Sequence, residues 1–176
     1  VLHSVCPWER FEASIKTQLY TKLRDLSGSP RPSAGEPRCG TMVVDVAGTA
    51  KGIWALPSIT EPVQGNETGY ITLANYPYRP ETELALSLGP EILGATVLVV
   101  PRATTGRVNR PFDQVTPDGL IYCYAPAPGE GGFINILLQM TGPSEIMIRK
   151  VPQTAPNICQ ADPSTWTMTG ATRMVR

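Results

Sequence analysis

Residues 119–151 decide the fold, and they contain three runs: Gly-Leu-Ile-Tyr-Cys-Tyr (119–124), Gly-Phe-Ile-Asn-Ile-Leu-Leu-Gln-Met (132–140) and Glu-Ile-Met-Ile-Arg-Lys-Val (145–151). Proline and glycine residues separate the runs, which marks the points where the chain turns. Short apolar or alternating runs of this length predict consecutive strands of an antiparallel sheet. The middle run is apolar on both faces between Phe133 and Leu138, which favours a central strand. We therefore expect a three-stranded meander against which the rest of the chain packs.

Length and composition narrow the class of protein. The chain has 176 residues, enough for one domain with a real core, and it contains 18 prolines and 16 glycines. That much Pro and Gly predicts many turns and short strands rather than a helical bundle. Its 15 basic and 15 acidic residues balance, so no general field attracts nucleic acid or an anionic membrane. No apolar run approaches the roughly 20 residues that a transmembrane helix needs.

Further short strands are predicted on both sides of the meander. The candidates are residues 41–46, 51–56, 70–74, 83–88 and 95–100, with weaker ones at 106–115 and 165–169. About eight strands, with turns at roughly ten-residue intervals, predict a mainly β domain. An antiparallel barrel is preferred and a sandwich is the alternative. We assign residues 1–176 to a single domain, with a β core at 39–151 and a C-terminal arm at 152–176.

One amphipathic helix is predicted near the N-terminus, over residues 8–26. Its apolar positions recur at spacings of three and four and form one stripe: Trp8, Phe11, Ile15, Leu19, Leu23 and Leu26. The polar face carries both signs of charge, so it lacks the basic surface expected on anionic lipid. We expect this helix to pack on its own sheet, with residues 27–38 as a loop or linker.

The four cysteines, Cys6, Cys39, Cys123 and Cys159, are widely dispersed and include no Cys-x-x-Cys pair. The only histidine is His3, so we expect no metal site and no cofactor. Two disulfides are the favoured interpretation, with three possible connectivities, among which we prefer Cys39–Cys123 with Cys6–Cys159. Disulfides predict a secreted or periplasmic protein. Because the chain begins at Val1, we also expect that a leader or larger preceding region has been removed.

The sequence lacks the common catalytic motifs, including Gly-x-Ser-x-Gly, the P-loop and His-Glu-x-x-His. A carboxylate pair drawn from Asp45, Asp113 and Asp118 is a conceivable catalytic group. The alternative is that Asp118-Gly119 forms a turn and Asp113 is a solvated loop residue. We therefore expect a non-catalytic module that binds a small molecule, a glycan or a protein, or has a structural role. The alternative is an enzyme of unrecognised type that works through carboxylates or arginines.

Gly52-Ile53-Trp54 is similar to the Gly-x-Trp motif that closes one end of lipocalin-like barrels. There an arginine on the last strand stacks over the indole, and Arg149 is the candidate for that part. The resemblance implies a barrel that carries a small apolar ligand bound near Trp54. The alternative, which we prefer, is that Trp54 fills the core and Arg149 is an exposed strand residue.

Two polar loops are candidate binding sites. One contains Tyr76, Tyr78 and Arg79, and the other, residues 102–110, contains Arg107, Asn109 and Arg110. Tyrosine and arginine are enriched at binding hot spots, and arginine suits carboxylate or phosphate groups. The alternative for each loop is an ordinary solvated hairpin tip. Nucleic acid is not expected, because the basic patch is local and the chain as a whole is neutral.

Several motifs in a fixed order give a wider resemblance. They read DVAGTAKGIW (45–54), GRVNRPF (106–112), VTPDGLIYCY (115–124) and ILLQ (136–139). In these, the chain resembles a family of uncharacterised, exported bacterial proteins over roughly residues 36–151. The resemblance implies an exported single domain. Related chains often carry a His-Asp-Asn cluster where this chain reads Leu86-Ser87-Leu88 or Asn75-Tyr76-Pro77, so no active site is implied.

Overall fold

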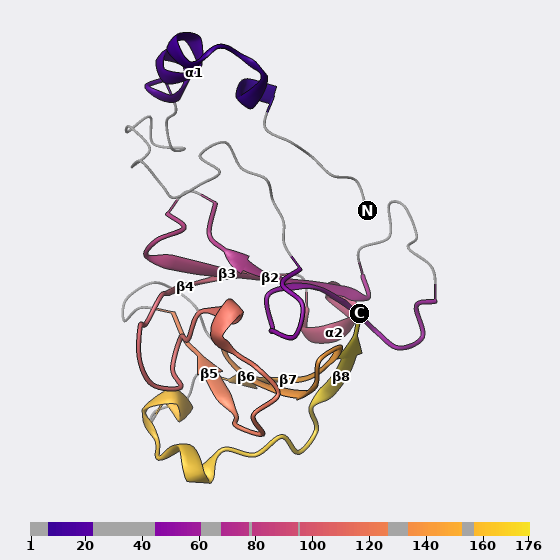
Figure 1. The fold of residues 1–176 in the computed structure, drawn as a ribbon. Helices are drawn as coiled ribbons and strands as arrows, with labels where there is room; N and C mark the ends of the chain where they lie inside the picture. Colours follow the sequence, from indigo (N-terminus) through magenta and orange to yellow (C-terminus); the bar gives the residue numbers. More distant parts are fainter. Residues whose placement is uncertain are drawn as a thin grey trace.

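The computed structural model describes residues 7–22, 45–60, 68–77, 79–94, 96–126, 134–152 and 157–176. The fold is mainly β, as predicted (Figure 1). Its strands are β1 (Gly52–Ala55), β2 (Tyr70–Asn75), β3 (Glu83–Leu88), β4 (Thr96–Pro101), β5 (Tyr122–Tyr124), β6 (Ile134–Gly142), β7 (Glu145–Pro152) and β8 (Thr172–Val175). The helical segments are η1 (Pro7–Arg10), α1 (Ala13–Tyr20), α2 (Pro90–Leu93), η2 (Phe112–Gln114), η3 (Ile158–Gln160) and η4 (Pro163–Thr165).

The eight strands form one antiparallel sheet that curls into a nearly closed barrel. Their order is β4-β3-β2-β1-β8-β7-β6-β5, so the first strand in the chain lies beside the last. Ala55 of β1 pairs with Val175 of β8, which joins the four strands β1–β4 to the four strands β5–β8. Strands β2–β4 and β5–β7 consequently face each other across the core (Figure 1). A barrel, rather than the alternative sandwich, is confirmed.

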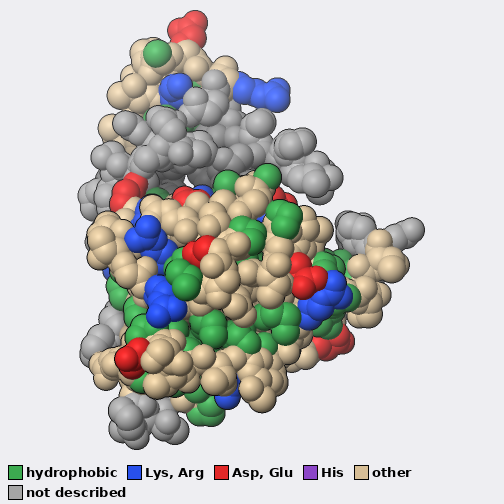
Figure 2. Space-filling view, turned by 60° about the horizontal axis from the view of Figure 1, so that its bottom comes forward, with side chains coloured by type: hydrophobic (Ala, Val, Ile, Leu, Met, Phe, Trp, Pro, Cys, Tyr) green, Lys and Arg blue, Asp and Glu red, His purple; other side chains and the backbone are tan. Residues whose placement is uncertain are grey.

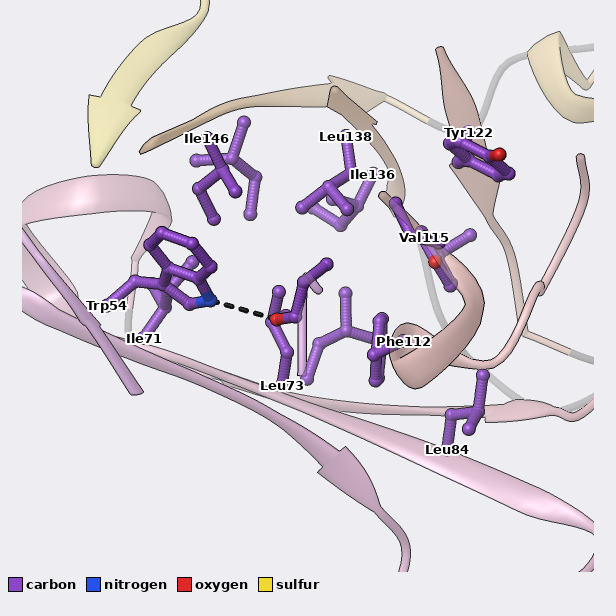
Figure 3. Packing of buried hydrophobic residues seen from close by; sticks show 14 of the residues in the cluster. Trp54, Ile71, Leu73, Leu84, Phe112, Val115, Tyr122, Ile136, Leu138 and Ile146 are labelled. Carbon is purple, nitrogen blue, oxygen red and sulfur yellow. Dashed lines mark hydrogen bonds between the residues drawn. The ribbon is translucent and has the colours of Figure 1, made fainter. Parts of the chain in front are cut away.

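Alternate residues of each strand point into the barrel, as strand geometry requires. Leu84, Leu86 and Leu88 of β3 all face inward, as their spacing predicts. Figure 3 shows side chains from both halves of the sheet meeting in the interior. The larger buried members of this core are Trp54, Ile71, Leu73, Leu84, Leu86, Leu88, Leu98, Val100, Phe112, Val115, Tyr122, Tyr124, Ile136, Leu138, Met140, Ile146, Ile148 and Met174.

The weaker strand predictions are corrected by the structure. Residues 165–169 are not a strand; the last strand is β8, and its four residues were too short a run to be recognised. Within residues 106–115 only Val108 forms a bridge, and η2 follows it. Of the strand predicted at 41–46, residues 41–44 lie outside the described residues. Val46 lies in a turn, where its carbonyl oxygen accepts a hydrogen bond from the amide of Thr49.

The N-terminal helix is shorter than predicted. Residues 7–10 form η1, Glu12 has extended backbone angles (φ −56°, ψ 150°), and α1 begins only at Ala13. No residue of α1 is buried, so the expected packing on the sheet is not seen in α1, and residues 23–26 lie outside the described part. In the described residues no helix is both long enough and apolar enough to cross a membrane.

The disulfide pairing predicted from sequence is wrong. Cys123 of β5 is bonded to Cys159 of η3, with their Cα atoms 5.5 Å apart, which excludes both Cys39–Cys123 and Cys6–Cys159. Tyr122 and Tyr124 face inward, so Cys123 between them faces outward, where the C-terminal arm lies. There Cys159 and Trp166 pack over Leu137 of β6 and cover the outer face of this half of the barrel. Cys6 and Cys39 lie outside the described residues.

Candidate functional site

Residues 103–109 bridge the two ends of the sheet order, β4 and β5. The amide of Ala103 donates to the carbonyl oxygen of Asn109 (2.9 Å), continuing from the end of β4. On the other side, the amide of Asn109 donates to Cys123 (2.8 Å), and the amide of Cys123 donates to Arg107 (2.9 Å). Arg107 and Asn109, predicted as binding residues, therefore belong to the segment that closes the barrel.

Asn109 holds this closure through its side chain as well as its backbone. Its φ of 53° is a left-handed conformation, which asparagine tolerates better than most residues. The side-chain amide donates to the carbonyl oxygen of Ala125 (3.0 Å) and accepts from the amide of Ala125 (2.8 Å). This pair of bonds substitutes for one backbone rung of a sheet. The burial of Asn109 is therefore explained by architecture.

The two polar loops predicted as separate sites lie against each other. The amide of Arg102 donates to the carbonyl oxygen of Thr82 (2.7 Å), and its guanidinium donates to that of Pro80 (3.4 Å). The β2–β3 turn and the bridging segment therefore share one end of the barrel. We call Arg79, Arg102, Arg107 and Arg110 the arginine rim. Tyr76 is half-buried in the same turn, and Tyr78 lies outside the described residues.

Each arginine of the rim has a partner within the protein. Arg79 forms an ion pair with Glu83 (2.8 Å), and Arg110 donates to the carbonyl oxygen of Thr104 (2.7 Å). The guanidinium carbon of Arg107 lies 5.6 Å from the ring centroid of Trp166. Because a guanidinium carries five N–H donors, these contacts do not use all the donors of any one of these arginines. The remaining donors are of the kind that pair with carboxylate or phosphate oxygens.

Charge on the face shown in Figure 2 is mixed rather than concentrated. On the face shown in Figure 2, Lys and Arg side chains occur in separate small groups, most of them with Asp or Glu nearby. Hydrophobic side chains gather between these groups. This pattern agrees with the zero net charge of the chain and gives no continuous basic surface on this face of the kind that a nucleic-acid backbone requires.

Trp54 seals one end of the barrel. Its side chain is fully buried, and the indole N–H donates to the carbonyl oxygen of Ala50 (2.9 Å). The guanidinium carbon of Arg176 lies 4.3 Å from the indole centroid. The same guanidinium donates to the carbonyl oxygens of Thr49 (2.7 Å) and Lys51 (3.0 Å), so it fastens the chain before β1 to the residue after β8.

The arginine that stacks on Trp54 is therefore not Arg149, the candidate from sequence. Arg149 donates from the outer side of β7 to the carbonyl oxygen (2.7 Å) and hydroxyl (3.0 Å) of Thr167, and so holds the C-terminal arm. Arg176 is not among the residues predicted to contact Trp54, because the sequence pattern did not predict β8. The alternation in Thr172-Arg173-Met174-Val175, followed by Arg176, was the signal that could have revealed it. Trp54 fills the core, as the preferred interpretation of the Gly-x-Trp motif predicts.

The three candidate carboxylates are used separately. Asp45 accepts from the amide of Ile53 (2.8 Å), and Asp118 accepts from the amide of Leu120 (2.9 Å). The latter bond makes Asp118-Gly119 the predicted turn, with Gly119 at φ 78°. Asp113 lies 4.0 Å from the ammonium of Lys51. No hydrogen bond or ion pair joins any two of these three described residues, and each is used by a different partner.

Two buried phenols in the core stay protonated over a wide pH range. Burial raises the pKa of Tyr122 to about 12, and its hydrogen bond to Asp118 (2.6 Å) adds to this shift. Burial likewise raises the pKa of Tyr124 well above its ordinary value, and its hydroxyl donates to the carbonyl oxygen of Arg110 (2.9 Å). Both shifts disfavour the phenolate, so neither tyrosine is prepared to act as a base.

Within the described ranges, no group of three or more His, Cys, Asp or Glu side chains is placed to hold a metal ion. Comparison of the chain with protein-family models, with curated proteins and with solved structures finds no match.

Proposed function

We propose that this protein is a non-catalytic module that acts outside the cytoplasm and binds an anionic partner, a glycan or a protein, through the arginine rim. The observation that carries the proposal is the meeting of two polar loops at Arg102, beside a barrel whose interior is filled. Arginine presents planar pairs of donors that match carboxylate, sulfate or phosphate oxygens. The rim thus offers a recognisable chemistry where the interior offers none.

The protein's own side chains fill the interior of the barrel, which favours a binding site on the exterior. Phe112 and Val115, from the segment between β4 and β5, lie in the core at 0% exposure. The ring of Phe112 lies 4.8 Å from that of Tyr124, centroid to centroid. The amides of Ala50 and Lys51 donate to the carbonyl oxygens of Val115 and Phe112 (2.9 and 3.2 Å), which fixes this plug in place. An eight-stranded barrel is just wide enough for side chains to fill.

The extracytoplasmic location is supported by the Cys123–Cys159 bond, since structural disulfides persist in oxidising compartments. The resemblance to exported bacterial proteins points in the same direction. Free thiols at both positions in protein recovered from its native compartment would contradict this part of the proposal.

Binding to a sulfated oligosaccharide of dextran, with uncharged dextran as the ligand control, tests the rim. We expect Arg79→Gln and Arg110→Gln each to weaken binding about tenfold, the usual effect of losing a charged hydrogen bond. Arg173→Gln is the matched control, because Arg173 also pairs with a glutamate, Glu145, but lies on β8. Equal weakening by all three variants, or no binding by the native protein, would contradict the proposal.

A second candidate is a carrier of a small apolar ligand. Trp54 and Arg176 close one end of the barrel in the manner of lipocalin-like carriers, which is the observation that favours it. A carrier would take up one apolar fluorophore per chain and change the fluorescence of Trp54. The filled interior predicts no such stoichiometric uptake, so this titration distinguishes the two candidates.

A further inference from the structure

The two end strands of the sheet, β5 and β4, differ in what covers their outer edges. On β5, the amide of Cys123 donates to the carbonyl oxygen of Arg107 (2.9 Å), and the carbonyl oxygen of Cys123 accepts from the amide of Asn109 (2.8 Å). On β4, the same bridging segment makes its backbone contact only past the end of the strand, where the amide of Ala103 donates to Asn109 (2.9 Å). The bridging segment therefore covers the edge of β5 but not that of β4.

The backbone groups of β4 point alternately toward β3 and away from the sheet. The amide of Arg102 donates to the carbonyl oxygen of Thr82 (2.7 Å), which marks this pair as hydrogen-bonded in the ladder between the two strands. Bonded pairs alternate along an antiparallel ladder, so Leu98 also bonds to β3, whereas Val97 and Val99 point the other way. Among the described residues, the amides and carbonyl oxygens of these two valines have no hydrogen-bond partner.

This open edge of β4 lacks the devices that usually protect an end strand. Such strands commonly carry charged side chains, bulges or prolines that prevent pairing with another chain. Residues 96–101 read Thr-Val-Leu-Val-Val-Pro, without a charge, and their six pairs with β3 run without a register shift. The proline, Pro101, stands last in the strand, and Val97 is 61% exposed. A regular, uncharged and exposed edge of this kind is suited to pairing with a further strand.

We propose that the protein forms a dimer in which β4 pairs antiparallel with β4 of a second copy, about a twofold axis that passes beside Leu98. In this register Val97 of one copy lies opposite Val99 of the other. Both valines point their backbone groups outward, so each such pair exchanges two N–H···O bonds. Every free amide and carbonyl oxygen of the two valines is then paired.

A second copy is the partner because this edge is complementary to itself. A twofold interface brings a strand against its own sequence, so any charge on β4 would face a charge of the same sign, and β4 has none. The β-branched side chains of Val97 and Val99 also form favourable cross-strand pairs. In the described part of a second copy, the edge of β5 is already bonded to Arg107 and Asn109, so β4 is the end strand left to pair. The assembly consequently closes at the dimer.

Sedimentation velocity of the full chain over a range of concentrations tests the dimer. An interface built on one strand pair is small, so we expect the mass to rise from 19.0 kDa to twice that value over the micromolar range. Val97→Pro removes an amide that no bond to β3 uses, and proline is tolerated at a sheet edge, so the fold is kept. We expect this variant to raise the dimer dissociation constant at least tenfold, because it loses a hydrogen bond on each side of the axis.

Val97→Thr is the matched control, because threonine keeps both the amide and the β-branched shape; its dissociation constant should stay within about threefold of the native value. A native protein that stays monomeric up to about 1 mM would overturn the inference. So would a dimer that Val97→Pro leaves unchanged, since the interface would then lie elsewhere, or assembly that continues beyond the dimer.

Residue-resolved hydrogen exchange, read by nuclear magnetic resonance, tests the same edge in the native protein alone. The amides of Val97 and Val99 should exchange slowly at high concentration and rapidly after dilution. The amides of Leu98 and Val100 bond to β3 in either state, so their exchange should not depend on concentration. Concentration dependence without this alternation would contradict pairing through β4. Neither measurement uses a ligand, so the inference stands or fails separately from the proposed function.

Discussion

Two tryptophan–arginine pairs lie in the described part of the chain, one inside the barrel and one outside it. Trp54 lies under Arg176 at 4.3 Å, and Trp166 lies under Arg107 at 5.6 Å. In both pairs the indole N–H donates to a nearby backbone carbonyl, that of Ala50 (2.9 Å) or Ile158 (2.8 Å). The local chemistry is therefore the same, and the two pairs differ in what surrounds them.

The inner pair joins the two ends of the barrel, whereas the outer pair attaches a layer to its surface. Arg176 reaches carbonyl oxygens both before β1 and, at Pro143, between β6 and β7. In the described part of the chain, the guanidinium of Arg107 makes no comparable set of hydrogen bonds. A cation–π contact therefore does not by itself indicate a large contribution to stability. The contribution depends on how many elements of the fold the arginine connects.

The largest expected effect comes from Trp54→Ala. Truncating a fully buried tryptophan costs about 3–5 kcal/mol of unfolding free energy, and here it also leaves Arg176 without its ring. Trp166→Ala is the matched variant, and we expect it to loosen the arm while the barrel unfolds near its native midpoint. Urea unfolding followed by far-UV circular dichroism measures both. Equal loss of barrel stability in the two variants would remove the distinction between the pairs.

Removal of the disulfide also compares the stability of the C-terminal arm with that of the barrel. The bond joins residues 36 positions apart, and in the chain-entropy model its loss costs about 2–4 kcal/mol. In the double variant Cys123→Ala/Cys159→Ala we expect fast hydrogen exchange in η3 and η4 and retained protection in β1 and β2. Loss of protection in β1 and β2 at the same rate would show that the arm is part of the core.

Replacement of the two arginines gives a smaller effect. Lysine keeps the charge but cannot reach several carbonyl oxygens at once, so Arg176→Lys should cost about 1–3 kcal/mol. Arg107→Lys should cost no more than about 1 kcal/mol, because Arg107 stacks on the ring of Trp166 and lysine keeps the charge that faces Asp162. The midpoint of thermal unfolding, compared between the two variants, measures the difference. A larger shift of the unfolding midpoint for Arg107→Lys than for Arg176→Lys would contradict the expectation that the inner pair contributes more to stability.

The smallest effect concerns pH and the inner core. The pKa of Tyr122 is about 12 in the folded protein and about 10 in the unfolded chain. The folded state therefore holds the proton more tightly, and this stabilisation is fully present below pH 10 and is lost as pH rises to 12. Tyr122→Phe should remove the part of this pH dependence that Tyr122 contributes. At neutral pH the variant should also lose about 1 kcal/mol of unfolding free energy, because the hydrogen bond to Asp118 is absent. An unchanged slope between pH 10 and 12 would contradict the assignment.

Sequence patterns were sufficient for the inner face of the barrel. Period-two alternation in Leu84, Leu86 and Leu88 identified β3 with its correct bounds, because each strand buries one face and exposes the other. The same reasoning gave the three strands of the meander. It failed at β8, where four residues are too few to show a period, and with β8 it missed the barrel closure and Arg176.

Contacts between distant segments could not be predicted in the same way. Cys123 and Cys159 are paired because one faces outward from β5 and the arm returns to it, and no spacing in the sequence encodes that return. Asn109 was predicted to bind a ligand, yet its amide completes the sheet beside Ala125. A polar residue in a loop can serve the fold or a partner, and only its neighbours in space distinguish the two. The role of Asn109 in the fold is explained by its contacts, whereas a role in binding a partner requires a binding measurement.

Peptide mapping of the non-reduced protein checks the covalent frame of both regions. We expect one peptide pair that joins Cys123 to Cys159, which leaves Cys6 and Cys39 able to pair only with each other. A peptide that joins Cys39 to Cys123 would restore the pairing first inferred from sequence and displace the arm.

Nuclear Overhauser effects in solution can test whether Trp54 and Arg176, the residue after β8, together seal the barrel. We expect cross-peaks between the Trp54 ring and the side-chain methylenes of Arg176, with the latter shifted upfield by the ring current. Cross-peaks from the Trp54 ring to Arg149 in place of Arg176, or to neither, would contradict this expectation.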